Sequence, residues 1–178
     1  QAGLTPDQYP VMSTSITEEE VQAIGSEFLK GQYAVWNYFM TIDNSVNQAY
    51  VEAFRAQYGE SRVTTDPMES AYIAVHLWKQ AVEKVRSEGT PQNLEQVRAA
   101  VIGQTFDAPE GPIKMYPNHH ISKFVRIGQV QEDGLFQIVY DSASAVPPSP
   151  WNQFVPETKG FVCDWTKTNV ENPGKFKP

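Results

Sequence analysis

Three consecutive hydroxyl residues, Ser13, Thr14 and Ser15, stand between a short apolar stretch and a pattern that starts a helix. The apolar stretch begins at Tyr9, and Thr17 to Glu20 has the Thr-x-x-Glu spacing of a capping box. Open α/β sheets bind small ligands where a strand ends and a helix begins. Hydroxyls donate and accept hydrogen bonds without charge, which suits a neutral amide. The alternative is that Ser15 or Thr17 only caps the helix.

A second candidate is the aromatic end of the next apolar stretch, from Gln32 to Met40. On a pleated strand, Trp36 and Tyr38 point to one face, and their neighbours Asn37 and Phe39 to the other. Only one pair can face a ligand. We take Tyr38 as a candidate ligand contact, and the alternative is that Trp36 and Tyr38 belong to the core.

Adjacent histidines, His119 and His120, suggest a metal site or an acid-base catalyst. In a strand they point to opposite faces and cannot share one ion, and the sequence has no HExxH pattern. The three carboxylates of Glu18 to Glu20 fan out around a helix and cannot converge on one ligand, so we expect a solvated first turn. The sequence therefore predicts no metal, no cofactor and no enzymatic activity. An amidase or metal hydrolase built on the two histidines remains the alternative.

Composition excludes several classes of protein. The net charge of −7 and pI of about 4.9 argue against a nucleic-acid partner, because phosphate binding needs clustered Lys and Arg. The one cysteine, Cys163, excludes an internal disulfide. Mean hydropathy is −0.44, and no stretch approaches the ~20 apolar residues of a membrane-spanning helix. Residues 1–9 lack the pattern of a signal peptide.

The first sixty residues alternate strand and helix. Residues 9–13 and 32–40 are predicted strands on either side of a helix over residues 18–29, which makes a βαβ unit and predicts a parallel sheet covered by helices. A third element, capped at Asp43 to Ser45, has helical spacing up to Gly59.

Two further helices and three strands follow. Asp66 is the predicted N-cap of a helix and Pro67 its first residue. This helix is so apolar that we expect it to be packed between two layers of secondary structure. A shorter helix covers residues 93–102. The period then changes to two, predicting strands over residues 112–116, 122–131 and 135–140, of which the last two form a hairpin. The tail from Ser142 is expected to be extended and anchored by aromatic residues.

Four patterns in this order resemble the type I periplasmic binding proteins of ABC importers, of the branched-chain amino acid type. Within that family they are most similar to the subunits that bind urea or short amides, and to amide-sensing regulators. The patterns are Val35 to Phe39 with Ile42 and Asp43, Asp66 to Glu69 with Tyr72, Pro117 to Lys123, and Phe161 to Trp165.

The resemblance implies two Rossmann-like lobes joined by three crossing segments, with ligand held between them. Residues 1–42 would belong to the second lobe, residues 43–121 to the returning part of the first lobe, and residues 122–178 to second-lobe strands and the C-terminal tail. Two such lobes need ~250 to 300 residues. We therefore expect this chain to be the carboxy-terminal half of the protein.

The resemblance also implies the function of particular residues. Ser13, Thr14, Ser15 and Tyr38 would contact the solute. The crossings would place Asn37, Asp43, His119 and His120 at the hinge.

The implied protein captures urea or a short amide, with an amino acid as another possible solute, and delivers it to the membrane permease subunits of an ABC importer. It is expected in the periplasm or elsewhere outside the cytoplasm, attached to the cell membrane in a Gram-positive cell. A cytoplasmic amide-sensing regulator of the same fold is the alternative. The isolated chain is expected to self-associate, because the helix around Tyr72 to Trp78 would lack its sheet.

Overall fold

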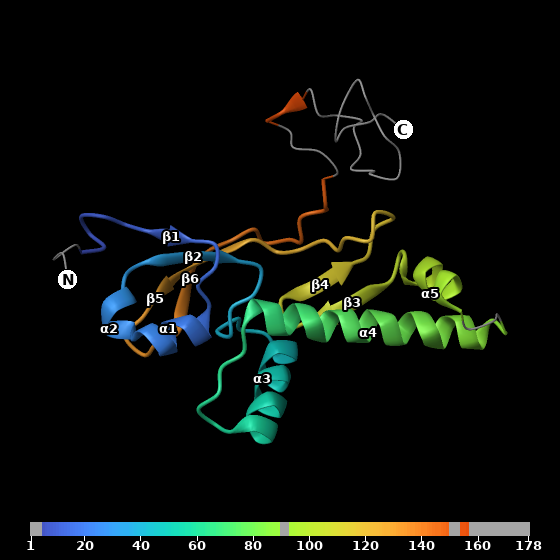
Figure 1. Ribbon diagram of the computed structural model, residues 1–178, viewed down its shortest axis with the longest axis horizontal. Helices are drawn as coiled ribbons and strands as arrows, with labels where there is room; N and C mark the ends of the chain where they lie inside the picture. Colours follow the sequence, from blue (N-terminus) through green and yellow to red (C-terminus); the bar gives the residue numbers. More distant parts are fainter. Residues whose placement is uncertain (1–4, 90–92, 150–153, 157–178) are drawn as a thin grey trace, which may run out of the picture. The chain divides into compact units, whose positions relative to one another are not determined.

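A computed structural model of the chain describes residues 5–89, 93–149 and 154–156 (Figure 1). The chain divides into two compact units, residues 1–147 and 148–178. All the helices and strands described below lie in the first unit. Most of the predicted aromatic-anchored tail lies outside the described residues, and so does Cys163.

A four-stranded mixed sheet forms what we call the sheet lobe. Its strands lie in the order β1 (Met12–Ser13), β2 (Tyr33–Trp36), β5 (Arg126–Val130) and β6 (Phe136–Asp141). Strand β1 pairs parallel with β2 across two short helices, α1 (Glu18–Ile24) and α2 (Ser26–Leu29), which confirms the βαβ unit. The sheet is not parallel throughout, because β5 and β6 form the predicted hairpin and β5 pairs antiparallel with β2.

Two elements of the sheet lobe are shorter than predicted. The helix expected over residues 18–29 is broken at Gly25, whose φ of 105° lies in a region that favours glycine. The strand expected to reach Met40 ends at Trp36. Beyond Trp36 the alternation of the pleat stops, and Tyr38 and Phe39 are both fully buried.

The remaining elements form what we call the helical lobe. These are α3 (Ser45–Tyr58), α4 (Asp66–Ser87), α5 (Leu94–Val101) and a hairpin of β3 (Thr105–Ala108) with β4 (Gly111–Lys114). Strand β3 was not predicted. The predicted N-cap of α4 is wrong: Thr65 precedes the helix and Asp66 is its first residue. The lobe boundaries at residues 42 and 121 stay a prediction for the complete protein.

Each apolar cluster lies within one lobe. In the core of the sheet lobe, Phe136 of β6 packs against Phe39, which follows β2, with tilted rings and centroids 4.8 Å apart. They leave no space above Gly128, where a Cβ would lie 2.8 Å from Phe39 and 2.9 Å from Phe136. In the helical lobe, Ile73 and Leu77 of α4 pack on the β3–β4 hairpin. The two lobes therefore have separate cores.

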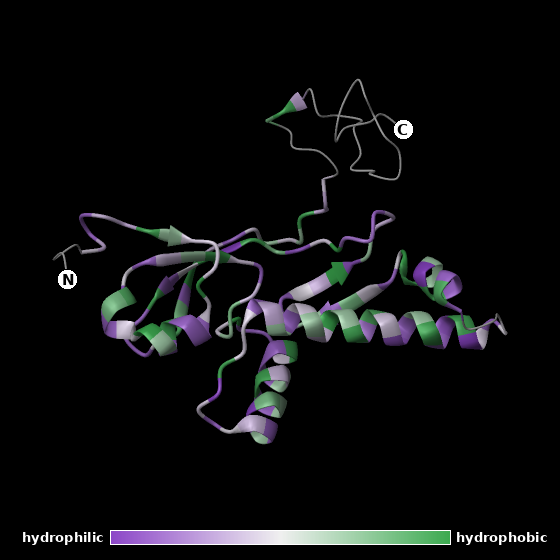
Figure 2. Ribbon diagram, in the orientation of Figure 1, coloured by the Kyte–Doolittle hydropathy of each residue, from purple (hydrophilic) through white to green (hydrophobic). Residues whose placement is uncertain are grey.

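Helix α4 is buried on one face only, which corrects the expectation of a helix between two layers. Its buried side carries Ile73, Leu77 and Val85, whereas Val75 and Trp78 are 64% and 61% exposed. Figure 2 shows hydrophobic residues along this helix. No helix among the described residues is long and apolar enough to cross a membrane.

This exposed face should cause the isolated 178-residue chain to associate with itself. Burying two large apolar side chains releases roughly 1.5 to 3 kcal/mol for each. We expect a dimer or larger species in light scattering coupled to size exclusion, and a shift to monomer after Val75→Gln with Trp78→Gln. Leu94→Gln removes a similarly exposed side chain from α5 and should leave the association unchanged. A monomeric unmodified chain at micromolar concentration would contradict this.

Candidate functional site

The hydroxyl turn lies where the carboxyl ends of the two parallel strands meet. Ser13 ends β1 and pairs with Ala34 of β2. The indole Nε1 of Trp36, at the end of β2, donates a hydrogen bond of 2.7 Å to the carbonyl of Ile16. Inside the turn, the amide of Ser15 donates to Ser13 Oγ at 3.1 Å. The turn is thus fixed against the neighbouring strand by backbone and side-chain bonds.

The capping function belongs to Thr17 and not to Ser15. Thr17 precedes α1, and its amide donates to Glu20 Oε2 at 2.8 Å, as the capping box predicts. Thr14 and Ser15 are exposed, and their hydroxyls have no hydrogen-bond partner among the described residues. These two hydroxyls are therefore available to a ligand.

The expected solvated first turn of α1 is wrong for one of its three carboxylates. Glu18 is 1% exposed, and its Oε1 accepts a hydrogen bond of 2.8 Å from the amide of Met40. Burial raises the pKa of Glu18 to about 7. Glu19 is half-exposed and pairs with Arg62 of the helical lobe at 3.1 Å. Glu18 and Glu19 therefore connect α1 to the segments beyond the sheet lobe.

Tyr38 lies in the core, where the alternative interpretation of the sequence had placed it. Its side chain has no exposed surface, and its hydroxyl lies 2.7 Å from both Asn47 Oδ1 and Thr64 Oγ1. Burial raises the pKa of the Tyr38 hydroxyl well above its usual range. Both hydrogen bonds of the hydroxyl are made within the chain, and a contact of Tyr38 with solute stays a prediction.

Asn37 marks the first segment that connects the lobes, residues 37–44. The carboxylate of Asp66 accepts hydrogen bonds of 3.0 Å from the amides of Asn37 and Tyr38. The side-chain amide of Asn37 donates to the carbonyl of Phe124 in the second connecting segment, residues 122–125. At the far end of the first segment, Asp43 is exposed and accepts a hydrogen bond of 3.1 Å from Gln48.

A lysine between two buried carboxylates holds the second segment to the helical lobe. Lys123 Nζ lies 2.7 Å from Glu110 and 3.4 Å from Glu69, and both carboxylates are fully buried. Burial raises the pKa of Glu69 to about 7 although Lys123 opposes the shift, and it also raises the pKa of Glu110. No local pattern in the sequence indicates this cluster, because its members lie 13 to 54 residues apart.

His119 and His120 lie outside the connecting segments. They are exposed in a turn between Met115 and Ile121, which pair antiparallel beyond the end of β4. His119 has a φ of 59°, and His120 Nδ1 lies 3.0 Å from the carbonyl of Asn118. The histidines therefore sit at the tip of an extended hairpin, and the hinge role expected from the resemblance stays a prediction. Within the described part of the chain, no three metal-ligating side chains gather at one point.

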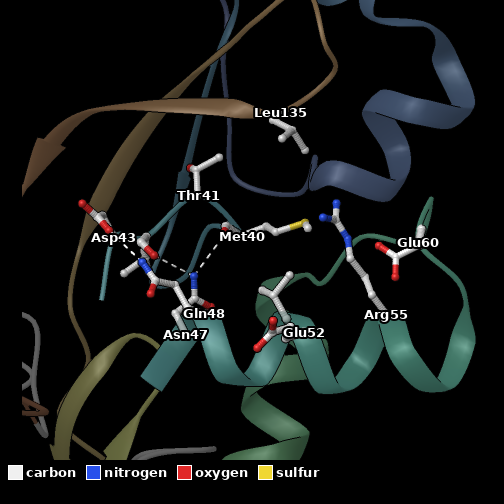
Figure 3. A pocket seen from close by; sticks show the side chains of 11 residues that line it. Met40, Thr41, Asp43, Asn47, Gln48, Glu52, Arg55, Glu60 and Leu135 are labelled. Carbon is white, nitrogen blue, oxygen red and sulfur yellow. Dashed lines mark hydrogen bonds between the residues drawn. The ribbon is translucent and has the colours of Figure 1, made fainter. Parts of the chain in front are cut away.

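An open groove of about 700 Å³ lies beside the first connecting segment (Figure 3). The segment supplies Met40 and Asp43, helix α3 supplies Arg55, and Leu135 comes from the turn between β5 and β6. The side-chain amide of Asn47, at the edge of the groove, already donates hydrogen bonds to the carbonyls of Met40 and Ile42. Both lobes thus contribute to this hollow, which no sequence motif indicated.

Comparison with known families identifies the class of protein. Residues 1–157 match the family described as periplasmic binding protein domain. The chain belongs to this family, and its α/β architecture with a mixed sheet and a hairpin is part of the type I periplasmic binding protein fold.

Individual relatives are longer than this chain. The solute-binding protein of an ABC transporter from Rhodopseudomonas palustris, in complex with benzoate, is 22% identical with a TM-score of 0.66, over 79% of this chain and 38% of that one. A branched-chain amino acid transporter substrate-binding protein from Streptococcus pneumoniae, in complex with isoleucine, is 19% identical with a TM-score of 0.60, over 78% and 37%. A curated protein of Geobacillus stearothermophilus named limonene hydroxylase is 32% identical over 127 residues, 71% of this chain and 23% of that protein.

Glu18 should make the stability of the chain depend on pH. Because folded Glu18 has a pKa of about 7 against an ordinary value of 4.5, the folded state holds its proton more tightly. The free energy of unfolding should therefore fall as the pH rises from 4.5 to 7, by on the order of 2 to 3 kcal/mol for this group.

Glu18→Gln removes this titration and keeps an oxygen for the amide of Met40. Guanidinium denaturation at pH 5 and pH 8 measures the loss of unfolding free energy as the pH rises. This loss should be smaller in Glu18→Gln than in the unmodified chain, and what remains should include the contribution of Glu69, whose pKa is also raised. Glu19→Gln, at the neighbouring half-exposed position, is the control and should keep the full pH dependence. If the free energy of unfolding changes equally between pH 5 and pH 8 in all three proteins, the assignment to Glu18 is contradicted.

Proposed function

We propose that this chain is part of a solute-binding protein of an ABC importer, which captures urea or a short amide between its two lobes. The observation that carries the proposal is the exposed hydroxyl turn at the carboxyl ends of the parallel strands β1 and β2. Membership of the periplasmic binding protein family supports the same assignment.

The chemistry of the turn favours a neutral solute. Thr14 and Ser15 offer hydroxyls that donate and accept, which matches the alternating N–H and carbonyl groups of an amide. The nearest carboxylates have other partners, because Glu18 binds the amide of Met40 and Glu19 binds Arg62. A charged carboxylic or amino acid needs an opposite charge at the site when it leaves water. No charged residue occurs from Ser13 to Thr17.

Outside the cytoplasm, the lobes would close on the bound solute, and the closed protein would deliver the solute to a permease in the membrane. The energy of closure comes from contacts that the solute makes with both lobes. The output of such a protein is binding and not chemistry. Ammonia release when the full protein is incubated with urea or acetamide would instead favour an amidase.

Calorimetry on the full-length protein tests the class of solute. We expect urea or acetamide to bind more tightly than leucine or benzoate, because the turn supplies hydrogen bonds without a charge. Leucine and benzoate represent the solute types held by the similar structures. Tightest binding of either would overturn the amide assignment and leave the fold unaffected.

Single substitutions test the turn itself. Among Ser13→Val, Thr14→Val and Ser15→Val, at least one should weaken solute binding by roughly five- to 150-fold, since an unpaired buried polar group costs ~1 to 3 kcal/mol. Ser87→Val, at the far end of α4, is the control, because Ser87 Oγ donates only to the carbonyl of Lys84 one turn back. Unchanged affinity in all three turn variants would remove the turn from the binding site.

A further inference from the structure

One buried guanidinium contacts both lobes and both of the segments that connect them. Arg126 begins β5, directly after the second connecting segment, and its side chain is 5% exposed. Its three nitrogens donate to three different acceptors: Nε to Asp141 Oδ2 at 2.6 Å, Nη1 to the carbonyl of Asn37 at 2.6 Å, and Nη2 to the carbonyl of Glu110 at 2.9 Å.

Each acceptor lies on a different part of the joint. Asn37 opens the first connecting segment, and Glu110 lies in the turn between β3 and β4 of the helical lobe. Asp141 ends β6 in the sheet lobe, and residues 142–146 after it run antiparallel to the second connecting segment through the pairing of Lys123 with Val146. Moving one lobe against the other must therefore change the surroundings of Arg126.

Arginine is suited to this position for a geometric reason. Its five N–H donors form a rigid planar fork, so the directions of three acceptors are fixed together. The plane also lies over the ring of Phe124, with the guanidinium carbon 4.6 Å from the ring centroid. Lysine carries the same charge but is a point donor on a flexible stem, and it cannot hold three acceptors in one plane.

We infer that Arg126 is a positioning residue that sets the angle between the lobes, and thereby the fraction of molecules ready to bind solute. A buried charge that loses its acceptors is strongly unfavourable, so few lobe arrangements satisfy the guanidinium. When the competent fraction falls, the apparent Kd rises by the same factor. The effect on affinity rests on the proposed function, whereas the effect on lobe angle does not.

The test compares Arg126→Lys with the same full-length protein without that change, after Cys163 and any other native cysteine have been replaced by Ser in both. Nitroxide labels at Gln57→Cys in α3 and Gln137→Cys in β6, two exposed positions in different lobes, report the distance between lobes without solute. We expect a broader distance distribution in Arg126→Lys and about tenfold weaker urea binding. Arg98→Lys changes an exposed arginine that pairs with Glu95 within α5, and should alter neither measurement.

A distance distribution in Arg126→Lys equal to that of the unmodified protein would overturn the inference, even if its denaturation midpoint falls. If the unmodified protein binds no urea but the distribution broadens, the proposed solute fails and the inference stands. If Arg126→Lys does not fold, Asp141→Asn is the deciding variant, because it keeps the arginine and removes the charge from one acceptor. It should broaden the distance distribution relative to the protein without the change, by less than is expected of Arg126→Lys.

Discussion

The structure depends on charges that are buried where the two lobes join. Removing an ion from water costs several kcal/mol unless hydrogen bonds and an opposite charge replace the lost hydration. Arg126 is therefore surrounded by acceptors from three segments, and Asp66 by the amides of Asn37 and Tyr38. Because these bonds fix Asn37, they also fix the preceding Trp36, whose indole holds the hydroxyl turn at Ile16. The position of the candidate site thus follows from the need to satisfy the buried charges.

Local sequence signals predicted the elements that depend on local bonds. Asn44 caps α3 through the amide of Asn47, Gly59 follows its last residue, and Thr17 forms a capping box with Glu20. The partners in these interactions lie only a few residues apart, so their spacing in the sequence predicts them. The break of one helix at Gly25 was not predicted, because glycine is tolerated inside a helical pattern and only its positive φ reveals the break.

The parts that sequence reasoning misplaced depend on partners far along the chain. Periodicity alone extends β2 to Met40, but the carboxylate of Asp66, 28 residues beyond Tyr38, draws the backbone out of the pleat. The same cause moves the start of α4, since an aspartate engaged by two amides cannot cap its own helix. Glu18 belongs to an acidic first turn by its spacing, and its burial follows from a bond to Met40, 22 residues away. The hydroxyl turn was found because a strand end followed by a helix start is a local feature.

Buried charges lie at the joint between the lobes beside buried apolar side chains, and the charges restrict how the joint can move. Among the described residues, the joint contains hydrogen bonds and ion pairs, such as Glu18 with Met40 and Glu19 with Arg62. It also contains buried apolar side chains of the connecting segments, such as Phe39 and Phe124. An exposed bond exchanged with water changes the free energy by only ~1 kcal/mol, whereas separating packed apolar surface costs ~25 cal/mol for each Å². Rotation of the lobes is therefore inexpensive for the exposed pairs. The buried charges limit it, because Lys123 and Arg126 must find acceptors in every arrangement that is populated. A joint built in this way favours a small number of defined lobe angles over continuous bending.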